Sequence, residues 1–232
     1  MNGLSLIIPA HNSEKVIESS LNNYYNTFSQ KFKELEIIVV CNDSSDNTAK
    51  ICLELGKKFP VKVIEIPYRG KGYALIEGFN NAKFEILGFL DADNPFDLNK
   101  VSEMINLLEK NHVVIASKYL KGDNKKQDSL QRRIISLGGN MVSRIFFNIQ
   151  FRDTQAGAKF FKKEVWGEIT KKNSKFVCNG FDWDIEFLYR IKKKNFSVAE
   201  FYIPVQQGKF STFRLKYIPG ILKRLFLLRF VK

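Results

Sequence analysis

The stretch EILGFLDAD, residues 85–93, passes from a short apolar run straight into two aspartates. A run of this length suits a buried strand better than a helix, so we predict a strand over Glu85–Leu90. Other short apolar runs bounded by polar residues resemble it, and we predict strands at Leu4–Ile8, Glu36–Cys41, Val61–Ile66 and Val113–Ser117. The fold is therefore expected to be built on a row of buried strands.

Segments with helical spacing of apolar residues separate these strands. We predict helices at Ser13–Phe28, Asp46–Phe59, Tyr73–Ala82 and Leu98–Lys110, with Ser13 as the N-cap of the first. Strands that alternate with helices form βαβ crossovers, so the expected fold class is α/β: a mostly parallel, Rossmann-like sheet flanked by helices. With 232 residues, the chain has room for one such domain.

The second half of the chain has a less regular pattern. We expect a lysine-rich mobile flap at Lys121–Gln131 and a helix at Arg132–Phe147, then shorter elements at Ala156–Phe161, Asp184–Lys194 and Ser197–Val205. Since no internal repeat and no Gly/Ser linker divides it from the first half, we assign both halves to one domain.

The charge balance is strongly basic, with 37 Lys and Arg against 24 Asp and Glu and a formal net charge of +13. This excess attracts phosphorylated substrates, anionic membranes or nucleic acid. We expect no nucleic acid partner, because the lysines are scattered along the chain whereas the acidic motifs have defined places.

Cysteine usage and the chain start bear on the cellular compartment. The 3 cysteines lack CxxC spacing, which predicts neither a disulfide framework nor a zinc site and fits a reducing cytoplasm. The start has no basic leader region, and no apolar stretch approaches the roughly 20 residues that span a bilayer. We expect a cytoplasmic chain that begins near Met1 and is soluble or peripheral.

The aspartates of the opening stretch lie where ligands of open α/β sheets gather, beyond the carboxyl end of a strand. Asp91 and Asp93 make half a site for a hard divalent cation such as Mg²⁺ or Mn²⁺, whose other positions take water and phosphate oxygens. A metal-bound diphosphate is the expected ligand. The alternative is that the aspartates cap the helix that begins near Asp97.

Two further polar junctions follow predicted strands. Gly70-Lys71-Gly72 is a small cationic turn whose glycines permit close approach of a phosphate, although an ordinary tight turn is the simpler explanation. The segment Asn42–Thr48 carries many short polar side chains. Some of them would cap the next helix through Ser45 or Asp46, and the others favour contact with a nucleoside.

Nine stretches in this order resemble glycosyltransferase family two: IIPAHNSE, VVCNDSSDNT, RGKGYALIEGF, GFLDAD, ASKYLKG, RRIISLGGN, RDTQAGAKFF, GFDWDIEFLYR and EFYIPVQ. The resemblance runs from the first strand to about Ser211. It is greatest to enzymes that make dolichyl- or polyprenyl-phosphate-linked glucose and mannose. It implies a GT-A fold, a nucleoside-diphosphate sugar donor, inversion at the anomeric carbon and a lipid phosphate acceptor.

The resemblance assigns roles to individual positions. It places on the donor side Pro9, Ala10, Asn12, Glu14, Asn42 and Lys71, and at the metal motif Asp91, Ala92 and Asp93. The acceptor-side motif DTQxGxK supplies Asp153, Gln155, Gly157 and Lys159, and its DxE partner supplies Asp184 and Glu186. Asp91, Asp93, Asp153 and Glu186 are the predicted catalytic residues.

The chain departs from the family pattern at several positions. Cys41-Asn42 stands where two aspartates are usual, which leaves the nucleotide preference open. Pro95 cannot supply the third metal ligand that some relatives have. His11 replaces a customary tyrosine, and Lys118 stands where arginine is common. A noncatalytic nucleotide-sugar-binding protein is therefore one alternative function.

The expected chemistry needs little acid–base help. A lipid phosphate is already anionic near neutral pH, so it needs positioning more than a strong general base. Lys118, Arg132 and Arg133 are candidates to hold that phosphate, and a solvated basic face is an equal alternative. Asp153 and Glu186 would bind sugar hydroxyls, or act as a base if the acceptor is a neutral hydroxyl of a soluble or cell-wall glycan.

We assign residues 1–212 to the catalytic domain and 213–232 to a basic amphipathic tail. The tail combines apolar residues with Lys216, Lys223, Arg224, Arg229 and Lys232, which predicts a helix lying peripherally on the cytoplasmic face of a membrane. Docking against the catalytic domain is the alternative. A separate membrane-anchored partner protein would also bring the enzyme to its lipid. DTQAGAK resembles the glucosyl branch of the family more than the mannosyl branch, which implies UDP-glucose rather than GDP-mannose as donor.

Overall fold

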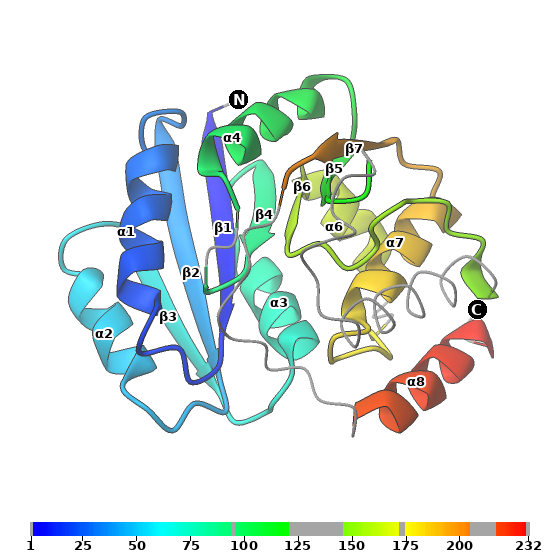
Figure 1. The fold of residues 1–232 in the computed structure, drawn as a ribbon, viewed down its shortest axis with the longest axis horizontal. Helices are drawn as coiled ribbons and strands as arrows, with labels where there is room; N and C mark the ends of the chain where they lie inside the picture. The colour runs from blue at the N-terminus through cyan, green and yellow to red at the C-terminus, as the bar shows by residue number, and fades with distance from the viewer. Residues whose placement is uncertain (1, 94–95, 121–145, 172–174, 205–216, 231–232) are drawn as a thin grey trace.

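A computed structural model describes residues 2–93, 96–120, 146–171, 175–204 and 217–230 of the chain. A 7-stranded sheet with the order β3-β2-β1-β4-β6-β5-β7 forms its centre (Figure 1). The strands are β1 (Gly3–Ala10), β2 (Glu34–Asn42), β3 (Val61–Ile66), β4 (Ile86–Leu90), β5 (Val113–Ser117), β6 (Ala158–Lys162) and β7 (Val198–Tyr202). The helices are α1 (Ile17–Phe28), α2 (Thr48–Leu55), α3 (Lys71–Asn80), α4 (Leu98–Asn106), the 3₁₀ turn η1 (Leu107–Glu109), α6 (Lys163–Thr170), α7 (Trp183–Lys193) and α8 (Ile218–Phe230).

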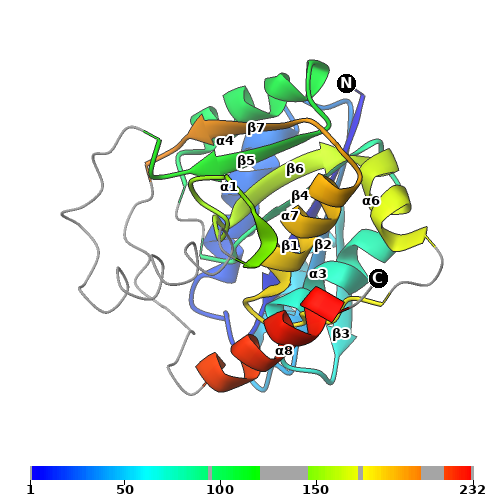
Figure 2. The same cartoon turned by 90° about the vertical axis from the view of Figure 1, so that its right-hand side faces the viewer.

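Helices cover both faces of the sheet because the strand residues alternate between two buried layers. Leu6 and Ile8 of β1 pack in the layer that holds α1, α2 and α4. Ile7, between them, packs in the layer that holds α3, α6 and α7. Figure 2 shows α8 beside this second layer, and Leu225 and Leu228 of α8 belong to its core. The predicted α/β fold with a mostly parallel sheet is confirmed.

One strand runs against the others. β6 pairs antiparallel with both β4 and β5, whereas β1, β2, β3 and β4 pair in parallel. Its register sets Ala158 beside Leu90. Because β6 starts where β4 ends, the segment that precedes β6 lies at the carboxyl edge of the sheet, next to Asp91.

An aromatic cluster fixes α7 against α3. The ring centroids of Phe79 and Phe161 are 5.0 Å apart, those of Phe79 and Trp166 also 5.0 Å, and those of Trp183 and Phe187 4.7 Å. Phe79 and Trp183, from the two helices, stack with centroids 5.9 Å apart. Large buried rings of this kind dominate core energetics, so the start of α7 is held firmly beside the end of α3.

Several local predictions need correction. Ser13 does not cap α1 with its side chain: Val16 is the N-cap, no side chain caps it, and the helix begins at Ile17. Helix α6 was not predicted. The predicted flap Lys121–Gln131 and most of the predicted helix Arg132–Phe147 lie outside the described residues. No helix in the described ranges is both long and apolar enough to cross a membrane.

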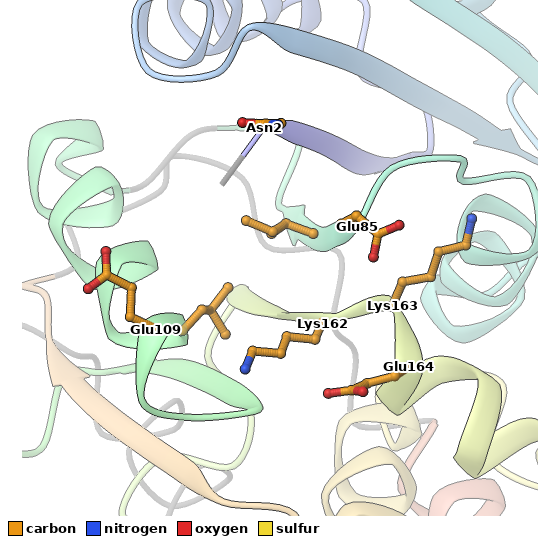
Figure 3. A pocket seen from close by; sticks show the side chains of 8 residues that line it. Asn2, Glu85, Glu109, Lys162, Lys163 and Glu164 are labelled. Atoms are coloured by element: carbon orange, nitrogen blue, oxygen red, sulfur yellow. The ribbon is translucent and has the colours of Figure 1, made fainter.

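A cavity of about 330 Å³ opens at the amino edge of the sheet, at the end opposite to Asp91 (Figure 3). Glutamates and lysines of mixed sign line it, among them Glu85, Glu109, Lys162 and Lys163. Since β4 begins here and ends at the predicted site, this cavity is separate from the residues that the sequence singled out.

Candidate active site

The two loops that follow β1 and β2 are bonded to each other. Asn12 Oδ1 accepts a hydrogen bond from the Ser45 backbone N at 2.8 Å, and Glu14 Oε2 accepts one from the Asn47 backbone N at 3.1 Å. In return, Asp46 accepts from the Glu14 backbone N at 3.0 Å. Several polar groups of Asn42–Thr48 thus form hydrogen bonds between the two loops. These bonds account for much of the polarity of this segment, for which we had predicted contact with a nucleoside.

Asn42 lies behind this junction rather than at its surface. It is 4% exposed. In the amide orientation that satisfies its neighbours, the nitrogen donates to the Ala10 carbonyl at 2.8 Å and the oxygen accepts from the Gly70 backbone N at 3.1 Å. The His11 ring nitrogen Nδ1 lies 2.8 Å from the Asn42 carbonyl. Asn42 therefore joins the end of β1 to the Gly70 turn, and its contact with a base stays a prediction.

Lys71 and Asp91 form the centre of the candidate site. Lys71 Nζ lies 2.8 Å from Asp91 Oδ1, with side-chain exposures of 14% and 34%. The ammonium also lies 4.7 Å from the centroid of the Phe89 ring. Burial lowers the pKa of Lys71, but the carboxylates of Asp91 and Asp184 outweigh it and hold that pKa above its ordinary value. A permanent positive charge therefore stands at the end of β4.

The Asp91 carboxylate is fitted closely into its surroundings. A Cβ on Gly157 would stand 1.8 Å from Asp91 Oδ2, so this position has no space for a side chain. The backbone carbonyl of Asp91 accepts a hydrogen bond from the Tyr24 hydroxyl at 2.6 Å. Asp97, not Asp91 or Asp93, caps α4, because its side chain accepts from the Asn99 backbone N at 3.0 Å. The capping alternative for the aspartate pair is therefore wrong.

The donor set at Asp91 and Asp93 fits a divalent cation that arrives with a ligand. Both carboxylates are partly exposed at the sheet edge. Within the described ranges, no three His, Cys, Asp or Glu side chains gather that could hold a metal ion. A hard cation bound by two carboxylates needs further oxygens, which the phosphates of a nucleotide supply.

A buried ion pair supports the acceptor-side segment. Lys159 is fully buried, and its Nζ lies 2.5 Å from Asp184 Oδ1 and 2.7 Å from the Ala156 carbonyl. Burial lowers the pKa of Lys159, against the opposing effect of Asp184. The pair fixes the chain just before β6, where Gly157 contacts Asp91.

Asp153 is also buried, with 4% exposure, and accepts hydrogen bonds from the backbone N of Lys118 and of Gln155, each at 3.3 Å. Burial raises its pKa, and the nearby charges of Lys118 and Lys159 only partly offset this effect. These bonds join the end of β5 to the acceptor-side segment. Gln155 and Lys118 are both partly exposed.

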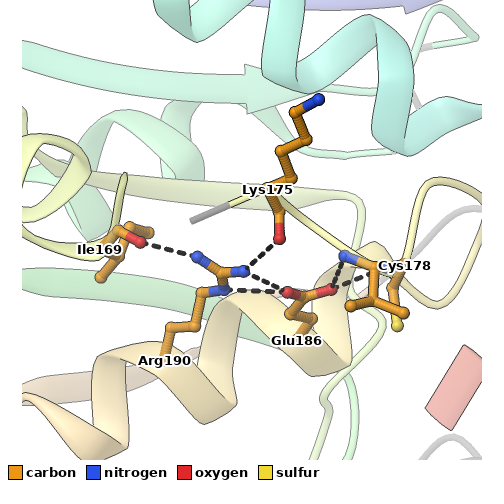
Figure 4. Close-up of polar contacts among 6 residues, drawn as sticks. Ile169, Lys175, Cys178, Glu186 and Arg190 are labelled. Atoms are coloured by element: carbon orange, nitrogen blue, oxygen red, sulfur yellow. Dashed lines mark hydrogen bonds and ion pairs between the residues drawn. The ribbon is translucent and has the colours of Figure 1, made fainter. Parts of the chain in front are cut away.

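Glu186 is enclosed in a network of its own (Figure 4). One oxygen accepts from the backbone N of Val177 at 2.9 Å and of Cys178 at 2.7 Å. The other accepts from Arg190 Nε at 2.9 Å and Nη2 at 2.6 Å. Both oxygens of this fully buried carboxylate are thus engaged within the protein. Its contact with a sugar hydroxyl stays a prediction.

The glycines of the Lys71 turn contact protein backbone. Gly70 has φ of 151°, and a Cβ there would stand 2.4 Å from the Asn179 carbonyl oxygen. A Cβ on Gly72 would stand 2.6 Å from the Asn179 carbonyl carbon. Sequence reasoning missed Asn179, because no local pattern signals a contact across so many residues.

Other predicted positions are placed only in part. Pro9 is partly exposed and Ala10 is buried, both at the end of β1. Arg132, Arg133 and Pro95 lie outside the described residues. Ala92 packs against the core between the two aspartates.

Comparisons with known proteins show what the chain is similar to. The chain is 31% identical over 166 residues to the dolichol-phosphate mannosyltransferase of Pyrococcus furiosus, which covers 70% of this chain and 47% of the relative. It is 27% identical over 213 residues to the dolichyl-phosphate beta-glucosyltransferase of Dictyostelium discoideum, which covers 85% of this chain and 64% of the relative. The chain thus spans about half to two thirds of the length of these relatives.

The chain also resembles a solved structure, that of glucosyl-3-phosphoglycerate synthase from Mycobacterium tuberculosis in complex with Mn²⁺, uridine diphosphate and phosphoglyceric acid. The two superpose with a TM-score of 0.70 and are 18% identical. The match covers 100% of the present chain and 80% of the synthase chain. This likeness confirms the expected GT-A fold. The family model described as Glycosyl transferase family 2 matches residues 5–170. The chain therefore belongs to glycosyl transferase family 2.

Proposed function

We propose that the chain transfers a hexose from a nucleoside-diphosphate sugar to a polyprenyl or dolichyl phosphate, with inversion at the anomeric carbon. The observation that carries the proposal is the Lys71–Asp91 pair at the carboxyl end of β4, inside the region that matches the family. We propose the lipid phosphate acceptor because the relatives are a dolichol-phosphate mannosyltransferase and a dolichyl-phosphate beta-glucosyltransferase. We favour UDP-glucose over GDP-mannose because DTQAGAK resembles the glucosyl branch.

On the donor side, Asp91 and Asp93 would hold Mg²⁺ or Mn²⁺ together with the diphosphate. The cation would offset the negative charge that grows on the departing nucleoside diphosphate. Lys71 supplies a second positive charge at that place, fixed in advance by its ion pair with Asp91. The backbone at Pro9 and Ala10 and the junction of Asn12 with Glu14 would line the nucleotide.

On the acceptor side, Lys118 would hold the lipid phosphate, with Arg132 and Arg133 as further candidates. An anionic phosphate oxygen attacks the anomeric carbon as the bond to the diphosphate breaks, so no proton has to be removed from the nucleophile. Gln155, which is partly exposed, would contact the sugar. Asp153 joins the backbone at Lys118 to the backbone at Gln155 through its two hydrogen bonds.

We also propose that α8 lies at a membrane surface. Leu222, Phe226 and Phe230 are 50%, 62% and 68% exposed. On the adjoining side of the same helix, Leu225 and Leu228 are buried against the domain. The docking and membrane alternatives thus apply to different faces of one helix. Exposed aromatic and aliphatic side chains of this kind, in a strongly basic chain, suit the cytoplasmic face of an anionic membrane.

The test uses the purified chain with polyprenyl phosphate, Mn²⁺ and either labelled UDP-glucose or labelled GDP-mannose. We expect label from UDP-glucose in the product extracted into organic solvent, and loss of transfer in the double variant D91A/D93A. The variant K71M should transfer about a hundredfold more slowly, the typical effect of losing one group that stabilises developing charge. K62M, which removes an exposed lysine of β3, serves as the control.

Three outcomes would contradict the proposal. Label that stays in the aqueous phase on an added glycan or small acceptor would make the chain a transferase of another acceptor class. Binding of sugar nucleotide with no transfer to any acceptor would indicate the noncatalytic alternative. Full transfer by D91A/D93A would remove the metal site from the mechanism.

A further inference from the structure

Helix α8 is tied to the catalytic domain by a two-point ion pair. Arg224 Nε lies 2.6 Å from Asp182 Oδ2, and Arg224 Nη2 lies 3.1 Å from Asp182 Oδ1. The Asp182 side chain is fully buried, whereas that of Arg224 is 28% exposed. A buried carboxylate depends on its partner, so the position of α8 matters to the residues around Asp182.

The residues around Asp182 form a turn over 177–182 that is held from both ends. Asp182 Oδ1 accepts a hydrogen bond from the Gly180 backbone N at 3.1 Å. At the other end, Glu186 accepts from the backbone N of Val177 and of Cys178. A Cβ on Gly180 would stand 3.1 Å from Arg224 Nη2, so the missing side chain gives the guanidinium its place. Both anchors are buried carboxylates.

The turn over 177–182 also contacts residues 70–73, on the proposed donor side of the site. The Asn179 carbonyl accepts from the Tyr73 backbone N at 3.2 Å, and Asn179 Nδ2 donates to the Tyr73 hydroxyl at 2.6 Å. Gly70 and Gly72 lie so close to Asn179 that neither has space for a Cβ. Lys71 stands between these two glycines. A shift of Asn179 would therefore shift the start of α3, and Lys71 with it.

A second contact joins the same parts. Tyr217, directly before α8, has its ring centroid 6.0 Å from the guanidinium carbon of Arg69, and it also lies 6.3 Å from the ring of Phe181. Arg69 precedes Gly70, and Phe181 precedes Asp182. The start of α8 thus contacts both turns directly, independently of Arg224.

We infer that Arg224 is a positioning residue for the donor site: through Asp182 it holds the turn over 177–182 against the Gly70–Gly72 turn and so places Lys71 beside Asp91. This inference rests on the proposed donor role of Lys71. It gives α8 a task apart from contact with a membrane, because the helix completes the support behind the diphosphate side of the site.

The test compares R224Q with K223Q in membrane-free solution. Each variant removes one positive charge from α8, but Lys223 is exposed and none of its described contacts involves the turn. We expect R224Q to speed amide hydrogen exchange in residues 70–73 and to weaken binding of UDP with Mn²⁺ by roughly tenfold, the scale of a small misplacement. K223Q should keep both at the wild-type value, and R224K should restore part of the loss.

Two further points keep the result decisive. If R224Q does not fold, D182N/R224Q replaces it, since two amides leave no buried charge and cannot rebuild the ion pair. Equal exchange at residues 70–73 and equal UDP affinity in R224Q and K223Q would overturn the inference. If the wild-type chain transfers no sugar to polyprenyl phosphate while faster exchange is still confined to R224Q, the proposed function is contradicted and the coupling stays supported.

Discussion

At the scale of single residues, Gly157 touches the Asp91 carboxylate so closely that a Cβ would stand 1.8 Å from Oδ2. The variant G157A should push this carboxylate aside and weaken Mn²⁺-dependent binding of UDP by roughly tenfold or more. The measurement is calorimetric titration with and without Mn²⁺.

G167A is the matched control, since nothing lies within 4 Å of a Cβ there. It should bind normally and gain up to about 1 kcal/mol of stability, because alanine suits a helix better than glycine. Equal binding by both variants would contradict this account.

Asp153 carries the second prediction at this scale. Its pKa is raised by burial, so the folded state holds the proton more tightly than the unfolded state does. The associated stability is present at acid pH and is lost as pH rises through the raised pKa. D153N should therefore gain stability relative to wild type as pH rises from about 3 to 7. Urea unfolding across this range checks it, with the exposed Glu18 variant E18Q as control. A difference in unfolding free energy between D153N and wild type that stays constant with pH would contradict the raised pKa of Asp153.

The sequence located correctly the residues whose position in the fold depends on their neighbours along the chain. Asp91 follows β4 directly, and Lys71 lies in its cationic turn, so both were found at the sheet edge. The partners of Glu186 and Asp184 were not predictable. The Asp184 side chain meets Lys159, and that of Glu186 meets backbone at Val177, because packing of α7 brings them together. An acidic motif in a sequence does not tell whether its oxygens face a ligand or the protein interior.

At the scale of elements, the network of α7 explains how the turn over 177–182 keeps its shape. Arg190 donates to Glu186, to the Ile169 carbonyl and to the Lys175 carbonyl, the last two at 2.8 Å. R190M leaves the buried carboxylate without its positive partner and should cost about 3–5 kcal/mol of unfolding free energy. K194M, which breaks an exposed pair with Glu168, should cost less than about 1 kcal/mol. Urea denaturation distinguishes the two, and similar small losses would show that the buried network contributes little.

Elements were predicted where the pattern was local and repeated. Alternating strands and helices in the first half reflect the buried faces of a parallel sheet, and all five predicted strands are present. The direction of β6 was not predictable, because pairing with β4 and β5 depends on the path of the intervening chain. Ser13 is a residue type that often caps helices, but in the structure its backbone N donates a hydrogen bond to the Thr48 hydroxyl of α2.

At the scale of the whole molecule, α8 presents two apolar faces, one against the domain and one outward. F226S/F230S should reduce binding to vesicles that contain anionic lipid by about tenfold or more, because two exposed aromatic rings are lost. UDP binding should stay unchanged, since neither ring contacts the turn over 177–182 in the described contacts. L53S, which removes an exposed leucine of α2, is the control for general loss of apolar surface. Vesicle flotation measures the effect, and normal flotation of F226S/F230S would contradict a membrane role for this face.

The presence of α8 was predicted from composition, yet its attachment through Asp182 was not, since the two partners are 42 positions apart.

The bonded junction between the β1 and β2 loops has a practical result for any attempt to change the proposed donor preference. The two loops are joined by hydrogen bonds that involve Asn12, Glu14, Asp46 and Asn47, so we expect neither loop to keep its shape alone. Transplanting a single loop from an enzyme that accepts a different nucleobase would break matched pairs on both sides. A successful swap has to exchange residues 10–14 and 42–48 together, as one cassette.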